Sequence, residues 1–130
     1  MYEPIVRNDL PDFLTVFDFA DPDVCTSQRN STTVPAQSLW MMNSPFICER
    51  AEQLAERLLA GGEVTDAERV GQLYASCLGR SATEDEQQLA LQFIAAAQQP
   101  SSTDADPSAA AAWEKLCHVL LASTEFRFVE

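Results

Sequence analysis

The sequence predicts an all-α protein, a small bundle of four to five amphipathic helices that follows an extended N-terminal arm. Apolar residues recur every three or four positions over most of the chain beyond residue 35, which is typical of helices with one buried face. Two Thr-x-x-Glu capping boxes mark helix starts at Thr65 and Thr83. The 130 residues, 46% of them hydrophobic, are enough for one core. We therefore expect a single helical domain over residues 1–130, with the arm at 1–34 and the helices at 35–130.

The arm is expected to contain one extended segment and one short helix. A strand is predicted at residues 2–6, because Pro4 disfavours a helix and β-branched residues follow it. A strand in an otherwise helical chain has no obvious neighbour, so its partner is expected outside this sequence. Asn8 or Asp9 then caps a short helix. Three apolar residues should occupy the buried side of that helix: Phe13, Leu14 and Phe17.

Two helices are predicted between residues 35 and 60. Thr33 can cap the first, and Pro35 suits its first turn. Pro45 interrupts the pattern, so a second helix is expected to start there, capped by Ser44. The predicted buried face of the second helix contains Ile47, Ala51, Leu54, Ala55, Leu58 and Leu59. The glycine pair at 61–62 should end it.

The two capping boxes open the next two helices. The helix after Thr65 should end at Gly79 and bury the stripe Val70, Leu73, Tyr74, Cys77 and Leu78. The helix after Thr83 is expected to turn Leu89, Phe93, Ile94 and Ala97 inward.

A polar, low-complexity loop at residues 98–108 precedes the last predicted helix, Ala109–Ser123. The apolar stripe of that helix contains Trp113, Leu116, Cys117, Leu120 and Leu121. Three apolar residues near the end of the chain are expected to pack on the bundle: Phe126, Phe128 and Val129.

The charge of the chain argues against two classes of partner. The chain has 20 acidic and 8 basic residues, for a net charge of −12. Sequence-independent nucleic-acid binding and docking on anionic lipid both need clustered Lys and Arg. No apolar run approaches the ~20 residues of a membrane-spanning helix, and no signal peptide is visible. We expect either a cytoplasmic protein or a piece of a longer chain whose targeting signal lies elsewhere.

Motifs for metal binding and catalysis are sparse. The sequence contains no glycine-rich phosphate loop, no GxSxG and no HExxH, and its single histidine, His118, excludes a multi-histidine metal site within this chain. Cys117-His118 ends like a haem-attachment motif, but Glu114 stands where CxxCH requires cysteine, so no cofactor is expected in this segment. His118 should be half-buried beside the apolar stripe, in a structural role.

The densest polar cluster lies at residues 26–33, where no side chain is apolar. This cluster contains Arg29, whose planar guanidinium can bind a carboxylate or a phosphate. Arg29 can therefore clamp the acidic arm onto the helices, or it can form an anion site with Asn30, Ser31 and Thr32.

Four cysteines are widely spaced: Cys25, Cys48, Cys77 and Cys117. The last two lie on helix stripes, so we expect free, buried thiols with raised pKa values. An oxidising compartment would make disulfide bonds possible. A nucleophilic pair of Cys25 and His118 has no further support.

Three segments carry a family resemblance: VRNDLPDFLTVFDFADPDVCTSQRNSTTVPAQSLWMMNSPF, LYASCLGRSATEDE and AWEKLCHVLLASTEFRFVE. They resemble the planctomycete family DUF1553, also called PSD1, over nearly the whole chain. The resemblance implies the C-terminal part of a longer domain, in a large exported protein of the periplasm or cell envelope that often carries a cytochrome-c-like domain. A c-type haem would then lie elsewhere in the full-length protein. Candidate residues in the first segment are Arg7, Asn8, Cys25, Arg29, Asn30, Ser31 and Thr32.

The sequence leaves two function classes open. One is a non-catalytic helical module that packs on the preceding domain of the same chain. The other is part of an enzyme whose site is completed by a missing N-terminal region, with polysaccharides as the substrates that the family resemblance implies. In that case Asp18 or Asp21 could supply a carboxylate for acid–base chemistry.

Overall fold

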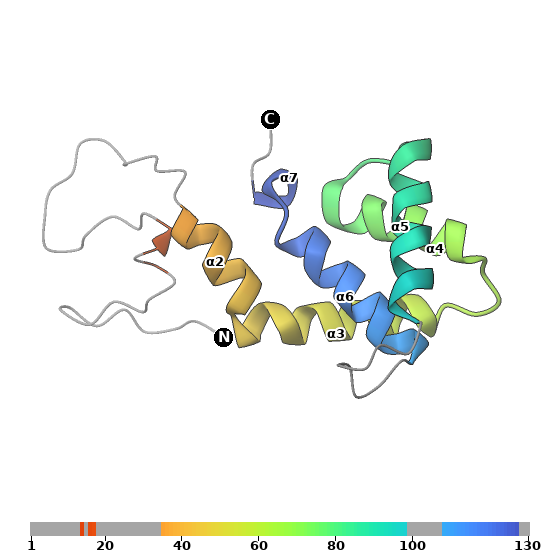
Figure 1. The fold of residues 1–130 in the computed structure, drawn as a ribbon, viewed down its shortest axis with the longest axis horizontal. Coiled ribbons are helices and arrows are strands. Elements are labelled where there is room, and N and C mark those ends of the chain that lie inside the picture. Colours follow the sequence, from red (N-terminus) through yellow and green to blue (C-terminus); the bar gives the residue numbers. More distant parts are fainter. Residues whose placement is uncertain (1–13, 15, 18–34, 99–107, 128–130) are drawn as a thin grey trace, which may run out of the picture. The chain divides into compact units, whose positions relative to one another are not determined.

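The computed structural model confirms the all-α class. It describes residues 14, 16, 17, 35–98 and 108–127, and the helices of this part are drawn in Figure 1. Six helices are assigned there, with no strand: α2 (Pro35–Asn43), α3 (Pro45–Leu59), α4 (Asp66–Leu78), α5 (Glu84–Ala97), α6 (Ala109–Leu121) and α7 (Thr124–Arg127). The chain divides into two compact units, Met1–Met41 and Met42–Glu130.

In the first unit, the described residues of the arm meet α2. Leu14 and Val16 are helical, as expected for the short helix of the arm. The Phe17 ring meets the Trp40 ring edge-to-face, with centroids 5.6 Å apart. The Gln37 side-chain amide donates to the Val16 carbonyl at 3.1 Å. The predicted strand at residues 2–6 lies outside the described residues.

In the second unit, α6 is the central helix. It packs most extensively on α3 and also contacts α4, α5 and α7. Its predicted stripe is confirmed, because all five residues are buried and Trp113 is only 1% exposed. The predicted face of α3 is also confirmed in its main positions, with Ile47, Ala51, Ala55 and Leu58 buried.

Local sequence signals set the ends of α4 and α5. Both capping boxes are present, with the threonine hydroxyl accepting from the N3 amide and the N3 glutamate accepting from the threonine amide. Gly79 ends α4 in the left-handed conformation, with φ of 69°. The side chain of Gln87 on α5 donates to the Ala67 carbonyl at 2.9 Å, which fixes α5 beside α4.

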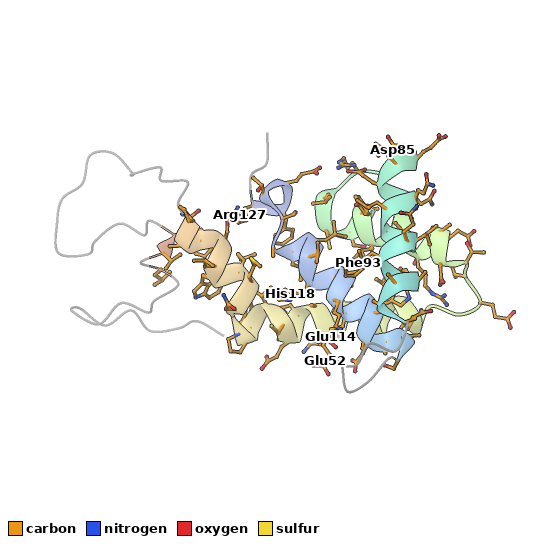
Figure 2. All side chains as sticks on the ribbon, viewed as in Figure 1. Glu52, Asp85, Phe93, Glu114, His118 and Arg127 are labelled. Atoms are coloured by element: carbon orange, nitrogen blue, oxygen red, sulfur yellow. The ribbon has the colours of Figure 1, made fainter. Side chains whose placement is uncertain are left out.

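Two predictions of the inward face of α5 were wrong. Leu89 is 68% exposed and Phe93 is 37% exposed, whereas Ile94 is buried as predicted and Ala90 is buried beside it. Phe93 is labelled on the α5 ribbon in Figure 2. The largest side chains on α5 therefore do not mark its buried face. Phe126 on α7 is 37% exposed, but α7 contacts α4 and α6, so this end of the described chain packs on the bundle as predicted.

The start of α3 also differs in one detail. Ser44 stands at the N-cap position with extended backbone, as predicted, but its side chain makes no capping hydrogen bond and is buried. Pro45 needs no amide partner at the first helical position, so the helix starts here without a side-chain cap.

Candidate functional site

A cleft of about 500 Å³ lies in the second unit, where α3 and α4 diverge beside the C-terminal end of α6. The first wall, from α3, supplies Arg50, Leu54, Arg57 and Leu58. The opposite wall, from α4, supplies Gln72, Ser76 and Cys77, and Leu121 and Phe126 complete the lining. The cleft thus combines two guanidinium groups with a mainly apolar floor.

Helical spacing places the two arginines in the cleft. Arg50, Leu54 and Arg57 follow one another at intervals of four and three residues, so they share one face of α3. Two turns of helix separate the arginines, which is about 10.5 Å along the axis. Leu58 is buried next to this face and anchors it to the core.

Each of these arginines contacts a residue four positions earlier in α3. The Arg50 guanidinium lies over the Phe46 ring, 5.2 Å from its centroid. The Arg57 Nε donates to the Gln53 carbonyl at 3.3 Å. Neither forms an ion pair with a carboxylate of the described residues.

A second arginine site lies where α4, α5 and α7 meet. Arg80 donates to both oxygens of Glu86, at 2.8 and 2.7 Å, and to both oxygens of Glu125, at 2.5 and 2.8 Å. Its guanidinium also lies over the Tyr74 ring, 5.6 Å from the centroid. Two carboxylates and a ring thus surround one cation, which joins residues 45 positions apart in the sequence.

The electrostatics of this cluster follow from those hydrogen bonds. Hydrogen bonds from Arg80, with further ones from Thr83, lower the pKa of Glu86 to about 2. Arg80 also lowers the pKa of Glu125. The pKa of Arg80 is raised by Glu86 and Glu125. Burial, followed by the charge of Glu86, raises the pKa of Tyr74. Arg80, Glu86 and Glu125 are therefore charged at neutral pH and bonded to one another, while Tyr74 stays neutral, which is typical of a structural clamp.

Cys48, Cys77 and Cys117 are free thiols in the structure. Burial raises the pKa of Cys77 and raises that of Cys117 to about 12. The predicted direction of both shifts is confirmed, although Cys77 is only partly buried and lines the cleft. Because the thiolate is the nucleophilic form, the raised pKa of Cys77 disfavours a nucleophilic role at neutral pH.

His118 lies on α6 and is half-buried, as predicted. It borders a mainly apolar recess of about 260 Å³ with Met42, Val119 and Ala122. Over the described ranges, no group of three His, Cys, Asp or Glu side chains is arranged to hold a metal ion.

The residues singled out in the sequence as site candidates all lie outside the described residues. They are Arg7, Asn8, Asp18, Asp21, Cys25, Arg29, Asn30, Ser31 and Thr32. Their proposed roles stay predictions. None of the described helices is both long and apolar enough to cross a membrane.

Sequence reasoning missed the two arginines of the cleft. The signal was present in the spacing of Arg50, Leu54 and Arg57, which places two cations on the face that carries apolar residues. Only the position of α4 shows that this face borders a cleft.

Residues 1–94 match the model of the family described as PSD1, Protein of unknown function (DUF1553). The match includes every candidate residue of the arm and both arginines of the cleft. It ends within α5, so the resemblance of the last segment stays a prediction. No curated protein and no solved structure matches the chain.

Proposed function

This chain belongs to the PSD1 (DUF1553) family, and we propose that it serves as a non-catalytic helical interaction module of a larger protein. The observation that carries the proposal is the lining of the cleft between α3 and α4. Guanidinium, amide, hydroxyl and apolar groups bind ligands, whereas proton transfer needs a group that titrates near the working pH. Among the described lining residues, Cys77 is the one titratable residue apart from the arginines, and its pKa is raised.

The resemblance of the N-terminal segment supports a more specific proposal. The chain is the C-terminal part of a planctomycete envelope protein, and it packs on the preceding domain of the same polypeptide. A cytochrome-c-like domain with its haem belongs to the same protein in this proposal.

A second candidate function follows from the polar stretch at residues 26–33. All of this stretch lies within the family match. An enzyme acting on polysaccharides would use Arg29 to hold an anionic group and Asp18 or Asp21 for acid–base chemistry, with the rest of the site supplied by the preceding domain.

Purification of the native protein from its source cells tests both candidates. For the interaction module we expect an intact mass well above the 14.3 kDa of this chain and recovery in the envelope fraction. Deletion of residues 42–130 from the gene should reduce the amount of folded full-length protein. A native cytoplasmic protein of 14.3 kDa would contradict the proposal. Polysaccharide cleavage by the native protein, lost on Arg29→Ala without a change in folding, would favour the enzyme.

A further inference from the structure

The two arginines of the cleft are unusual for so acidic a chain. The net charge is −12, yet neither Arg50 nor Arg57 forms an ion pair with a described carboxylate. By contrast, Arg69 pairs with Asp66 at 3.0 Å, and Arg80 binds two glutamates. No carboxylate of the described part of the chain therefore neutralises the two positive charges of the cleft.

The phase of α3 explains why these arginines do not pair with the carboxylates of their own helix. Glu49, Glu52 and Glu56 lie on the same helix, and none of them lines the cleft. At 3.6 residues per turn, the acidic row lies roughly 80–160° around the helix from the arginine row. Glu52 of the acidic row is labelled in Figure 2. The helix thus presents one acidic face and one basic face, and the basic face borders the cleft.

The spacing along the basic face selects the shape of the ligand. The two guanidinium groups stand two helical turns apart, with Leu54 and Leu58 supplying the apolar contact beside and between them. A partner helix with two carboxylates seven residues apart has the same separation of about 10.5 Å. Apolar residues three and four positions after the first carboxylate would meet the leucines.

The cleft is open rather than enclosed. Five of its nine lining residues are exposed, including both arginines, Gln72 and Ser76 on the opposite wall, and Phe126. Small-molecule sites usually bury 70–90% of the ligand surface. An open cleft of this kind suits a polypeptide, which brings its own surface to cover the exposed floor.

We propose that the cleft between α3 and α4 binds an acidic amphipathic helix of a partner polypeptide, with Arg50 and Arg57 each pairing with one carboxylate. This inference rests on the proposed interaction function and specifies its surface. On the other wall, the Gln72 side chain can donate to or accept from the partner, and the Ser76 hydroxyl, which donates to the Gln72 carbonyl at 2.7 Å, can accept. Leu54, Leu58 and Leu121 receive the apolar side chains.

A fluorescein-labelled synthetic helical peptide tests this surface by anisotropy titration. The peptide carries Glu at two positions seven apart and Leu at the third and fourth positions after the first Glu. We expect saturable binding that weakens as salt is added, since exposed charge pairs are screened. Replacing both Glu by Gln in the peptide should weaken binding by roughly tenfold or more, equivalent to about 1.4 kcal/mol.

The matching protein variant is Arg50→Glu with Arg57→Glu. It should lose affinity for the Glu peptide by roughly tenfold or more and should bind a peptide with Lys at the two positions instead. The control is Lys115→Glu, which makes the same charge reversal once, at an exposed position of α6 outside the cleft. It should leave the affinity for the Glu peptide within about threefold, a difference below 1.4 kcal/mol. Because the Glu-to-Gln peptide requires no protein variant, the test remains decisive if the charge-reversed protein misfolds.

Three outcomes would overturn the inference. The first two are absence of saturable peptide binding and equal affinity for the Glu and Gln peptides. The third is displacement of the labelled peptide by a small anion, dodecanoate or inorganic phosphate, at a lower concentration than unlabelled peptide requires. The failure of this inference is distinguishable from that of the proposed function. Suppose that deletion of residues 42–130 reduces the amount of folded full-length protein, whereas Arg50→Glu with Arg57→Glu does not change it. The proposed interaction function would then stand, and this cleft would not be the interaction surface.

Discussion

The same bundle uses arginine in two opposite ways. Around Arg80, two carboxylates and the Tyr74 ring converge from three helices, and four hydrogen bonds join the guanidinium to the two carboxylates. In the cleft, Arg50 and Arg57 have no described carboxylate as a partner. Since the chain has an excess of carboxylates, the difference comes from placement and not from supply. Tertiary contacts bring glutamates to Arg80, whereas helical phase keeps them away from the cleft.

This comparison separates a structural arginine from one that is available for recognition. Arg80, which follows α4, forms one bidentate pair with Glu86 of α5 and another with Glu125 of α7. Replacing Arg80 should therefore lower the free energy of unfolding. An exposed guanidinium without an ionic partner contributes little to folding and retains its donors for a ligand.

The largest effect on stability is expected from a substitution in the core, on the central helix α6. Trp113 on α6 is 1% exposed, and Trp113→Ala should lower the free energy of unfolding by about 3–5 kcal/mol. Urea denaturation followed by far-UV circular dichroism measures this. Val119→Ala is the control on the same helix, because Val119 is 57% exposed and should change stability by no more than about 0.5 kcal/mol. Equal effects of the two substitutions would contradict the described core.

The next effect concerns the clamp itself. Arg80→Ala leaves Glu86 and Glu125 next to each other without their shared cation, so the urea midpoint should fall, although by less than for Trp113→Ala. Arg80→Lys keeps the charge but loses the planar fork, and it should give an intermediate midpoint. If the urea midpoint of Arg80→Ala equals that of the wild type, the clamp does not stabilise the fold.

A smaller effect is expected at the cap next to the clamp. Thr83 accepts from the Glu86 amide, and Thr83→Ala should lower the free energy of unfolding by about 1 kcal/mol. Thr83→Ser retains the hydroxyl and should restore most of that stability. Equal loss in both variants, measured in the same urea titrations, would show that the hydroxyl is not the stabilising group.

Acid should weaken the clamp in a defined pH window. The folded pKa of Glu86 is lowered to about 2 from 4.5, so its contribution to stability is complete above pH 4.5 and is lost as the pH falls towards 2. Glu125 acts in the same direction, because its pKa is also lowered by Arg80. The difference in urea midpoint between the wild type and Arg80→Ala should therefore shrink across this window. A constant difference would mean that these carboxylates do not stabilise the fold through Arg80.

The helices could be predicted largely because their signals are local. The two capping boxes and Gly79 act within one turn: α4 and α5 begin where the boxes place them, and α4 ends at Gly79. The face of α5 was less predictable, because Leu89 and Phe93 are apolar without being buried. On a helix rich in alanine, small residues that permit close approach can face the core and leave larger ones outside.

The candidate site could be predicted only in part. The helical spacing of Arg50 and Arg57 is readable in the sequence, but the second wall of the cleft comes from α4 and depends on how the helices diverge. Likewise, the pair of Arg80 and Glu125 joins residues far apart in the chain. Such contacts are set by tertiary packing and have no local signature.

The most direct test of the contrast between the two arginine sites is one urea titration series with the wild type, Arg80→Ala and the double variant Arg50→Ala with Arg57→Ala. We predict a lower midpoint for Arg80→Ala and a free energy of unfolding within about 0.5 kcal/mol of the wild type for the double variant. The opposite ranking, with a stable Arg80→Ala protein and a destabilised double variant, would assign the structural role to the cleft arginines and contradict this account.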